Sequence, residues 1–228
     1  MLIHYDIEQN TPDWDVVRAG KFSSSSASTF LSGEKTEGFS NLAKTVAWGR
    51  KYGPADEPSF KNKSTERGHL LEPEARDWYI FETGNAVIEA GFVEPQLNSH
   101  FGWSPDGLIF DACGVLAAGI EIKSLEHKAF MDVLKTRKVP SVYVYQVQWA
   151  MCVAKLQWLD FIVYHPQAGG LIIRCYPDQE IFARFEERLP IAEALVQEWI
   201  AILESGNKEQ AKAYSQQELT VTDFDINF

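Results

Sequence analysis

Gly102–Gly107 has the sequence Gly-Trp-Ser-Pro-Asp-Gly, and Gly119–Ser124 has the sequence Gly-Ile-Glu-Ile-Lys-Ser. Side chains alternate between the two faces of a β-strand, so a strand over the second stretch places Glu121 and Lys123 on the same face. Two carboxylates, Asp106 and Glu121, can hold a hard divalent cation, and an ammonium beside them can act on a water nucleophile or on developing charge. The two stretches therefore point to the chemistry of phosphodiester hydrolysis.

Each stretch also has a simpler interpretation. Pro-Asp-Gly is a favoured turn sequence, so Asp106 taken alone could be an ordinary turn residue. Glu121 and Lys123 could be a surface charge pair on an edge strand. The sequence from Val115 to Ile122 is apolar apart from Glu121, which favours an internal strand. A charged pair on an internal strand is costly unless it binds something.

A third carboxylate, Glu72, lies in the sequence Arg-Gly-His-Leu-Leu-Glu-Pro-Glu-Ala-Arg, which spans Arg67–Arg76. Its neighbours on a helix, Leu71 and Tyr79, are apolar, and Pro73 is expected to bend the helix at this point. We interpret Glu72 as a functional carboxylate, and the alternative is one more charge on a solvated helix face.

Gln146 lies in a largely apolar helical segment with the sequence Tyr-Val-Tyr-Gln-Val-Gln-Trp-Ala-Met. A buried glutamine needs hydrogen-bond partners. Gln146 could therefore make a core hydrogen bond, or it could orient an attacking water or a phosphate.

The composition of the 228 residues, 45% of them hydrophobic, predicts one domain over residues 1–204 and a polar tail over 205–228 that is mobile or partner-dependent. No run of about 18 apolar residues exists, and the N-terminus has no basic-then-apolar leader. The three cysteines, Cys113, Cys152 and Cys175, match neither a zinc knuckle nor a disulfide framework. These features predict a cytoplasmic protein without a membrane segment.

The net charge of −11 is unevenly distributed. Residues 1–67 carry 9 basic and 9 acidic side chains, residues 68–170 carry 7 and 12, and residues 171–228 carry 5 and 11. This pattern excludes a nucleic-acid binder whose whole surface is basic, but it leaves room for a local basic groove.

Hydrophobic periodicity and turn signals predict both helices and strands. We expect helices over residues 41–51, 64–82, 127–137, 141–155 and 178–204. We expect strands over residues 86–93, 102–110 and 115–124, and a hairpin formed by 159–165 and 171–176. The run Ser23–Ser26 indicates a helix N-terminus with free N–H groups, and residues 32–40 predict a flexible loop.

Four motifs occur in a fixed order: Arg-Gly-x-x-x-Glu-Pro-x-Ala-Arg from Arg67, Ser-Pro-Asp-Gly-Leu from Ser104, Glu-x-Lys from Glu121, and Tyr-x-x-Gln-Val-Gln from Tyr143. This ordered set resembles the PD-(D/E)XK nuclease superfamily and, within it, the phage lambda exonuclease or YqaJ-type viral recombinase branch. The resemblance covers roughly residues 12–165.

The resemblance implies an α/β fold with a PD-(D/E)XK restriction-endonuclease-like core, in which helices flank a central mixed sheet. It also implies a ring-shaped homotrimer, encoded by a phage or prophage, that acts on ends of double-stranded DNA. The implied reaction is processive 5′→3′ digestion of one strand to mononucleotides. The remaining 3′ overhang would be handed to a single-strand annealing recombinase.

The resemblance further implies that Glu72, Asp106, Glu121 and the backbone carbonyl of Ile122 hold two Mg²⁺ ions in each active site. Three carboxylates with few nitrogen or sulfur ligands also favour Mg²⁺ or Mn²⁺ over zinc. We therefore expect Mn²⁺ to substitute for Mg²⁺.

Two further catalytic roles follow from the same resemblance. Lys123 would activate or position the water, and Gln146 would lie beside the scissile phosphate. A 5′-phosphate site would be formed by Arg18, Ser25 and Ser104, and an arginine fork beside a serine-rich helix start is a plausible anion site on physical grounds.

Some family positions are occupied differently here. The family's apolar wedge, which splits the terminal base pairs, falls on polar Thr65, so Phe60 is an alternative wedge. A DNA-tracking arginine of the family falls near Lys35. Arg18 has an alternative interpretation as a surface ion pair with Asp15.

The leading hypothesis is thus an Mg²⁺-dependent exonuclease directed by the 5′-phosphate. The first alternative is an endonuclease or repair nuclease of the same superfamily, and the second is a catalytically silent DNA-end-binding protein. A ring would have its inner wall lined by four basic residues: Arg50, Lys51, Lys61 and Lys63.

Overall fold

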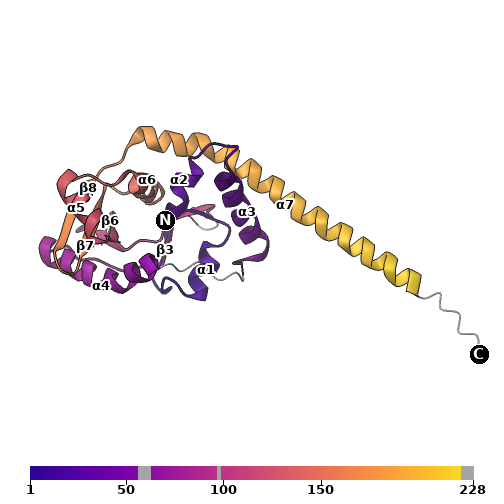
Figure 1. Cartoon of the computed structure of the whole chain (residues 1–228), viewed down its shortest axis with the longest axis horizontal. Coiled ribbons are helices and arrows are strands. Elements are labelled where there is room, and N and C mark those ends of the chain that lie inside the picture. The colour runs from indigo at the N-terminus through magenta and orange to yellow at the C-terminus, as the bar shows by residue number, and fades with distance from the viewer. Residues whose placement is uncertain (56–62, 97–98, 222–228) are drawn as a thin grey trace, which may run out of the picture.

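The computed structural model describes residues 1–55, 63–96 and 99–221, and the side chains of these residues except those of 63–66 and 207–221. The fold is mixed α/β, with a central sheet covered by helices (Figure 1). None of the helices in these ranges is both long and apolar enough to cross a membrane.

The central sheet contains β5 (Gly107–Phe110), β6 (Leu116–Ser124), β7 (Trp158–His165) and β8 (Gly169–Cys175), in that spatial order. β5 is antiparallel to β6, β6 is parallel to β7, and β7 is antiparallel to β8. β6 therefore has a partner on both sides. The prediction that Glu121 lies on an internal strand is confirmed, and the edge-strand alternative is wrong.

Helices cover the sheet on both faces (Figure 1). On one face, Ile120 and Ile122 pack in a cluster with Ala75 and Tyr79 of α4 (Lys63–Thr83). A separate, larger cluster contains residues of β7 together with α5 (His127–Thr136) and α6 (Ser141–Ala154). Alternate side chains of β6 point to opposite faces of the sheet, so the core consists of one cluster on the α4 side and another on the side of α5 and α6.

Two small strand pairs join the N-terminal segment to residues 92–102. β1 (Leu2–His4) is antiparallel to β3 (Phe92–Glu94), and β2 (Phe22–Ser23) is parallel to β4 (Phe101–Gly102). In the second pair Ser23 lies opposite Gly102. The serine run is therefore held beside the segment that leads from β4 to Asp106.

The strand predicted over residues 102–110 is wrong as one continuous element, because it is divided into β4 and β5. Pro105 lies in the interruption, where it has no N–H to donate to a neighbouring strand. The break takes Asp106 out of the regular ladder. The strand predicted over 86–93 is reduced to a single bridge at Ile88 and to β3.

The helix predictions are confirmed for α4, α5 and α6 to within one or two residues, and Pro73 lies inside α4. Three shorter helical segments precede them: α1 (Pro12–Arg18), a 3₁₀ turn η1 (Ser24–Ser26) and α2 (Ala27–Phe30). α3 (Glu37–Tyr52) begins earlier than predicted, because Thr36 accepts a hydrogen bond from the backbone N–H of Phe39 at 3.3 Å and caps the helix.

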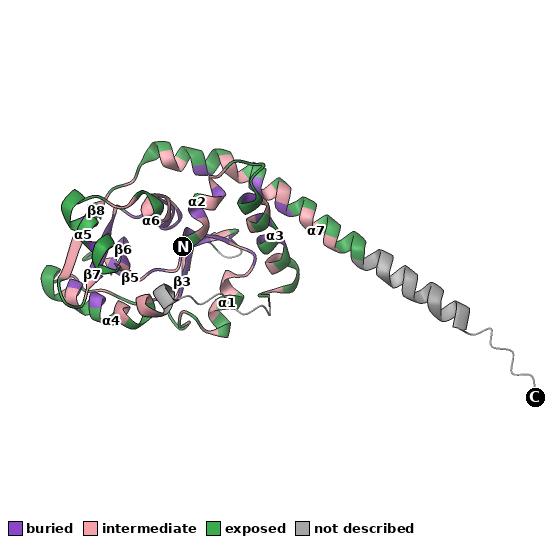
Figure 2. Ribbon diagram, viewed as in Figure 1, coloured by how far each residue is buried: buried purple, intermediate pink, exposed green. Residues whose placement is uncertain are grey.

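α7 (Gln179–Val221) is much longer than the predicted helix over 178–204, which is wrong at its C-terminal end. The segment from Lys208 to Glu218 contains mostly Ala, Gln, Glu and Lys, which favour helix, and no proline. The first half of α7 contains the buried residues Phe185, Ala192 and Val196. This half of the helix packs against α2 and α3 (Figure 2). The assignment of residues 205–228 as a separate tail stays a prediction.

Candidate active site

Asp106 is held against the middle of the central sheet. One of its carboxylate oxygens, Oδ2, accepts a hydrogen bond from the backbone N–H of Ile122 at 2.6 Å. The antiparallel pairing of Gly107 with Ile120 brings the two segments together. The side chain of Asp106 therefore lies next to the strand that carries Glu121.

Glu121 is the most enclosed residue of the site, with 2% of its surface exposed. Its Oε1 atom accepts from Lys123 Nζ at 2.6 Å and from Gln146 Nε2 at 2.6 Å. Within the described part of the chain, the buried Oε2 atom has no hydrogen-bond partner. Strand alternation places Lys123 on the same face as predicted, and α6 supplies Gln146 from above the sheet.

Glu72 approaches the site from α4. Its Oε1 atom accepts from Arg76 Nη2 at 2.7 Å, and Arg76 Nε also donates to the backbone carbonyl of Asp106 at 2.9 Å. His69 Nδ1 lies 4.0 Å from the second carboxylate oxygen of Glu72. Arg76 thus links the helix that carries one carboxylate to the turn that carries another.

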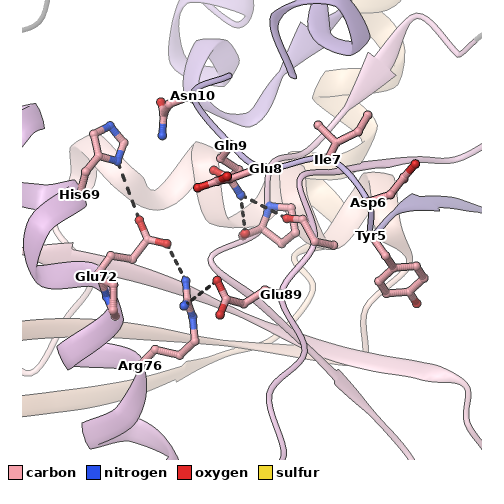
Figure 3. A pocket seen from close by; sticks show the side chains of 13 residues that line it. Tyr5, Asp6, Ile7, Glu8, Gln9, Asn10, His69, Glu72, Arg76 and Glu89 are labelled. Carbon is pink, nitrogen blue, oxygen red and sulfur yellow. Dashed lines mark hydrogen bonds and ion pairs between the residues drawn. The ribbon is translucent and has the colours of Figure 1, made fainter. Parts of the chain in front are cut away.

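Glu72, Asp106 and Lys123 line a cavity of about 300 Å³. A second cavity of about 470 Å³ adjoins it and shares three of its lining residues, Gln9, His69 and Glu72 (Figure 3). The first cavity is also lined by three of the predicted site residues and by one aromatic side chain: Asp106, Ile122, Lys123 and Tyr143.

The pKa values of the three carboxyl groups are raised, chiefly by burial. Burial, with repulsion from Asp106, raises the pKa of Glu72 to about 7 although Arg76 opposes the shift. Burial raises the pKa of Glu121 to about 7 against the attraction of Lys123. Burial also raises the pKa of Asp106, against Lys123 and the N–H of Ile122. A divalent cation would relieve all three shifts by favouring the ionised forms.

Lys123 is held in its charged form. Burial alone lowers its pKa, but the adjacent Glu121 and Asp106 carboxylates outweigh burial and raise the pKa of Lys123 above its ordinary value. Its ammonium also lies 5.3 Å from the centre of the Tyr143 ring. Lys123 is therefore equipped to donate hydrogen bonds to a water or phosphate oxygen rather than to take a proton.

The donor set fits a hard divalent cation. Most of the available ligands are carboxylate and carbonyl oxygens. Glu121 Oε2, which has no hydrogen-bond partner among the described residues, is a buried acceptor that a cation would satisfy. No three His, Cys, Asp or Glu side chains of the described ranges form a ready-made metal cluster. Lys123 and Arg76 occupy part of the carboxylate surface of Glu121 and Glu72.

Arg18 and Ser104 are joined through an intervening tryptophan. The guanidinium of Arg18 lies 3.9 Å from the centre of the Trp14 ring, and Trp14 Nε1 donates to Ser104 Oγ at 3.1 Å. Burial lowers the pKa of Arg18 although Asp15 attracts its charge, and Arg18 Nε is buried without a hydrogen-bond partner among the described residues. No ion pair of the described residues joins Arg18 to Asp15, so the surface-pair interpretation is not supported.

The other predicted DNA contacts are less closely defined. Ser25 is exposed and shares a 3.1 Å hydrogen bond with Ser23, whose strand lies beside Gly102. Lys35 is exposed in the turn before α3. Phe60 lies outside the described residues, and only the helical backbone is described for Thr65.

The basic wall of a ring stays a prediction, and within one chain Arg50 is already paired. Its guanidinium is mostly buried, binds both carboxylate oxygens of Glu193 at 2.6 and 2.7 Å, and donates to the carbonyl of Gly20. Lys51 is bound to Glu204 at 2.6 Å. Lys61 and the side chain of Lys63 lie outside what the structure describes.

Three residues of this region were missed by the sequence analysis. Arg76 could have been found, because it lies four residues after Glu72 on a helix and such pairs face each other. Trp14 and Gln9 gave no comparable signal, because their partners Ser104 and Pro105 are far away in the sequence.

Comparison with known proteins gives a consistent result. Residues 13–157 match the model of a family described as the YqaJ-like viral recombinase domain. No curated protein matches the chain. The structure resembles an alkaline exonuclease (LHK-Exo) from Laribacter hongkongensis, with 29% sequence identity and a TM-score of 0.73, over 89% of this chain and 100% of that chain. The same values apply to LHK-Exo in complex with dAMP.

A phage-related exonuclease from Haemophilus somnus 129PT is also similar, with a TM-score of 0.58 and 16% identity, over 80% of this chain and 96% of that chain. At this identity the likeness concerns the fold alone.

Proposed function

The chain belongs to the YqaJ-like viral recombinase family, and from this premise we propose that it digests linear duplex DNA from a 5′-phosphorylated end with the help of Mg²⁺. It has the PD-(D/E)XK nuclease fold and is a phage-type exonuclease that acts on DNA. The nucleases of its family depend on metal ions. The identity of the metal, the direction of digestion and the duplex requirement are our proposals.

The observation that carries the proposal is the arrangement around Glu121. A carboxylate that is 2% exposed is held by an ammonium and an amide, keeps one oxygen without a partner among the described residues, and lies beside Asp106. Such an arrangement is expensive to bury unless it serves a cation and an anionic substrate. Mg²⁺ matches a donor set dominated by carboxylate and carbonyl oxygens better than zinc does.

We propose that Asp106, Glu121, Glu72 and the carbonyl of Ile122 would hold two Mg²⁺ ions. The bound metal would polarise the scissile phosphate and lower the pKa of a water.

The residues of this chain perform the remaining tasks. Lys123, held as an ammonium, would donate to the attacking water or to a phosphate oxygen, and the amide of Gln146 would orient the phosphate beside Glu121. Both side chains contact Glu121 Oε1. The groups that would bind the nucleophile, the phosphate and the cation therefore lie next to one another.

We propose that Arg18, with Ser104 and Ser25, binds the 5′-phosphate. The stacking of Arg18 on Trp14 leaves its Nε without a partner among the described residues, so the guanidinium has donors to offer an anion. The hydrogen bond from Trp14 to Ser104 keeps this group near the segment that leads to Asp106. A strand end could thereby be held while the next phosphodiester is cut.

The test of the proposed function is a linear duplex labelled separately at each 5′ and 3′ end. In Mg²⁺ we expect mononucleotides from the 5′-phosphorylated strand and a surviving 3′ overhang. We expect no digestion in chelator, and binding without efficient cleavage in Ca²⁺, which does not impose the octahedral geometry of Mg²⁺. Internal fragments would indicate an endonuclease, shifted but uncut DNA would indicate an end-binding protein, and full activity in chelator would rule out metal dependence.

Replacement of Arg18 by alanine tests the end-recognition role. Charge-assisted hydrogen bonds to the doubly charged terminal phosphate contribute about 1.5–3 kcal/mol. Wild type should therefore digest a 5′-phosphorylated duplex roughly 10–100-fold faster than a 5′-hydroxyl duplex, at about 1.4 kcal/mol per tenfold. Arg18→Ala should shrink this ratio more than it slows digestion of the hydroxyl substrate, and it should shorten digestion tracts.

Lys138→Ala is the control, because Lys138 is an exposed cation after α5. It should leave the phosphate-to-hydroxyl ratio unchanged. If Arg18→Ala also leaves that ratio unchanged, another residue reads the 5′ end.

We further propose that the protein acts as a homotrimeric ring and supplies its 3′ overhangs to a single-strand annealing recombinase. Light scattering should then give a mass of three chains of 25.8 kDa, with or without DNA. A monomer at working concentration would remove the enclosed-channel explanation of processive digestion.

A further inference from the structure

Arg76 is a buried cation whose three donor directions are all used. Arg76 is 8% exposed. Its Nε donates to the carbonyl of Asp106 at 2.9 Å, and its Nη2 donates to the carboxylate of Glu72 at 2.7 Å. Its Nη1 lies 2.8 Å from the carboxylate of Glu89 (Figure 3). Glu89 is 72% exposed in its side chain, so this contact lies at the surface. The other two contacts reach inward to the proposed metal ligands.

Gln9 also lines the larger cavity, and it contacts the segment Pro105–Asp106 that Arg76 contacts (Figure 3). Its Nε2 atom donates to the carbonyl of Pro105 at 2.7 Å and to the carbonyl of Ala90 at 3.3 Å. Gln9 belongs to the N-terminal segment that follows β1, whereas Arg76 belongs to α4. Two parts of the chain that are distant in sequence therefore bind consecutive carbonyl groups.

We propose that Arg76 and Gln9 are positioning residues that fix the direction of the Asp106 side chain and the approach of Glu72, and thereby set the geometry of cation binding. This inference rests on the proposed function.

The physical reason lies in the two carbonyls. The carbonyls of Pro105 and Asp106 belong to the peptide units on either side of the Asp106 α-carbon, and each peptide unit is planar. Holding both planes leaves the backbone at Asp106 little freedom to rotate. The contact of Asp106 Oδ2 with the N–H of Ile122 then fixes the carboxylate itself.

Arg76 adds a second constraint, because the same guanidinium binds Glu72. The planar fork of arginine can donate in three directions at once, whereas the ammonium of lysine cannot reproduce that fork. The distance from α4 to the Asp106 turn is thus set by one rigid group. Mg²⁺ requires near-ideal octahedral coordination, so a small shift between these carboxylates would weaken binding.

The experiment measures Mn²⁺ binding by full-length protein without DNA, using the electron paramagnetic resonance signal of the free ion. The variants are Gln9→Ala, Arg76→Lys and, as matched control, Glu89→Ala, which removes only the outer contact of Arg76. Loss of an outer partner of a metal ligand typically weakens binding about 10–100-fold, and we expect this for Gln9→Ala and Arg76→Lys. Glu89→Ala should change the dissociation constant less than about threefold, because its contact is exposed.

A second readout separates positioning from general loss of structure. The Mg²⁺ concentration that gives half-maximal digestion should rise in Gln9→Ala and Arg76→Lys, and saturating Mg²⁺ should recover most of the turnover. If Arg76→Lys does not fold, Gln9→Ala decides the outcome.

Two results would overturn the inference. If wild type digests the labelled duplex but the folded variants bind Mn²⁺ as tightly as wild type, the positioning role is wrong while the proposed function stands. If wild type neither binds Mn²⁺ nor digests the duplex, the proposed function fails and the inference fails with it.

Discussion

Replacement of Lys123 by alanine is expected to reduce the rate of duplex digestion by about 10²–10³-fold, the range typical for loss of a hydrogen-bond donor that stabilises developing charge. Lys123 Nζ lies 2.6 Å from Glu121 and close to Asp106, whose charges keep it an ammonium. Without it, a water or phosphate oxygen loses its donor, and the clustered carboxylates lose a compensating cation. The measurement is single-turnover digestion of a 5′-phosphorylated duplex in saturating Mg²⁺.

DNA binding should persist in this variant, because the ammonium acts at the reacting phosphate and not along the duplex. A mobility-shift titration in Ca²⁺ and a thermal melt in Mg²⁺ would check binding and folding. Lys128→Ala provides the control, since Lys128 is an exposed lysine of α5. Near wild-type turnover of a folded Lys123→Ala variant would refute the catalytic role.

Replacement of Asp160 by alanine is expected to lower the free energy of unfolding by about 1.5–3 kcal/mol, the range for hydrogen bonds to a charged group, because the side chain of its partner Arg174 is 44% exposed and can be rehydrated. Asp160 is completely buried in β7. It accepts two hydrogen bonds from Arg174 at 2.9 Å each and one from the hydroxyl of Tyr79 at 2.8 Å. The substitution leaves the buried Tyr79 hydroxyl without this acceptor and removes a tie between α4 and the sheet.

For a chain of this length, the change corresponds to a fall in melting temperature on the order of 10 °C. Differential scanning calorimetry would measure it, with Glu82→Ala as the control, because Glu82 is an exposed acid near the end of α4. A shift no larger than that of the control would show that the Tyr79–Asp160–Arg174 cluster contributes little to stability. Because α4 also carries Glu72, this cluster supports the site indirectly.

Local patterns predicted a large part of the fold. The alternation of Ile120, Glu121, Ile122 and Lys123 was enough to predict an internal strand with one functional and one core face, because strand periodicity is a property of the backbone. Helical periodicity likewise located α4, α5 and α6. The predictions were wrong where an element's limits depend on a single interaction, as with the Thr36 cap of α3.

The sequence by itself determined which chemistry we propose for this chain, because local motifs and their order single out Glu72, Asp106, Glu121 and Lys123. Only the tertiary structure decided which residues contact those groups and which basic side chains are already paired with carboxylates. The contacts of Gln9 with Pro105, Trp14 with Ser104, and Arg50 with Glu193 join residues far apart in the chain. No local periodicity encodes such contacts, since they exist only after the strands pair and the helices pack.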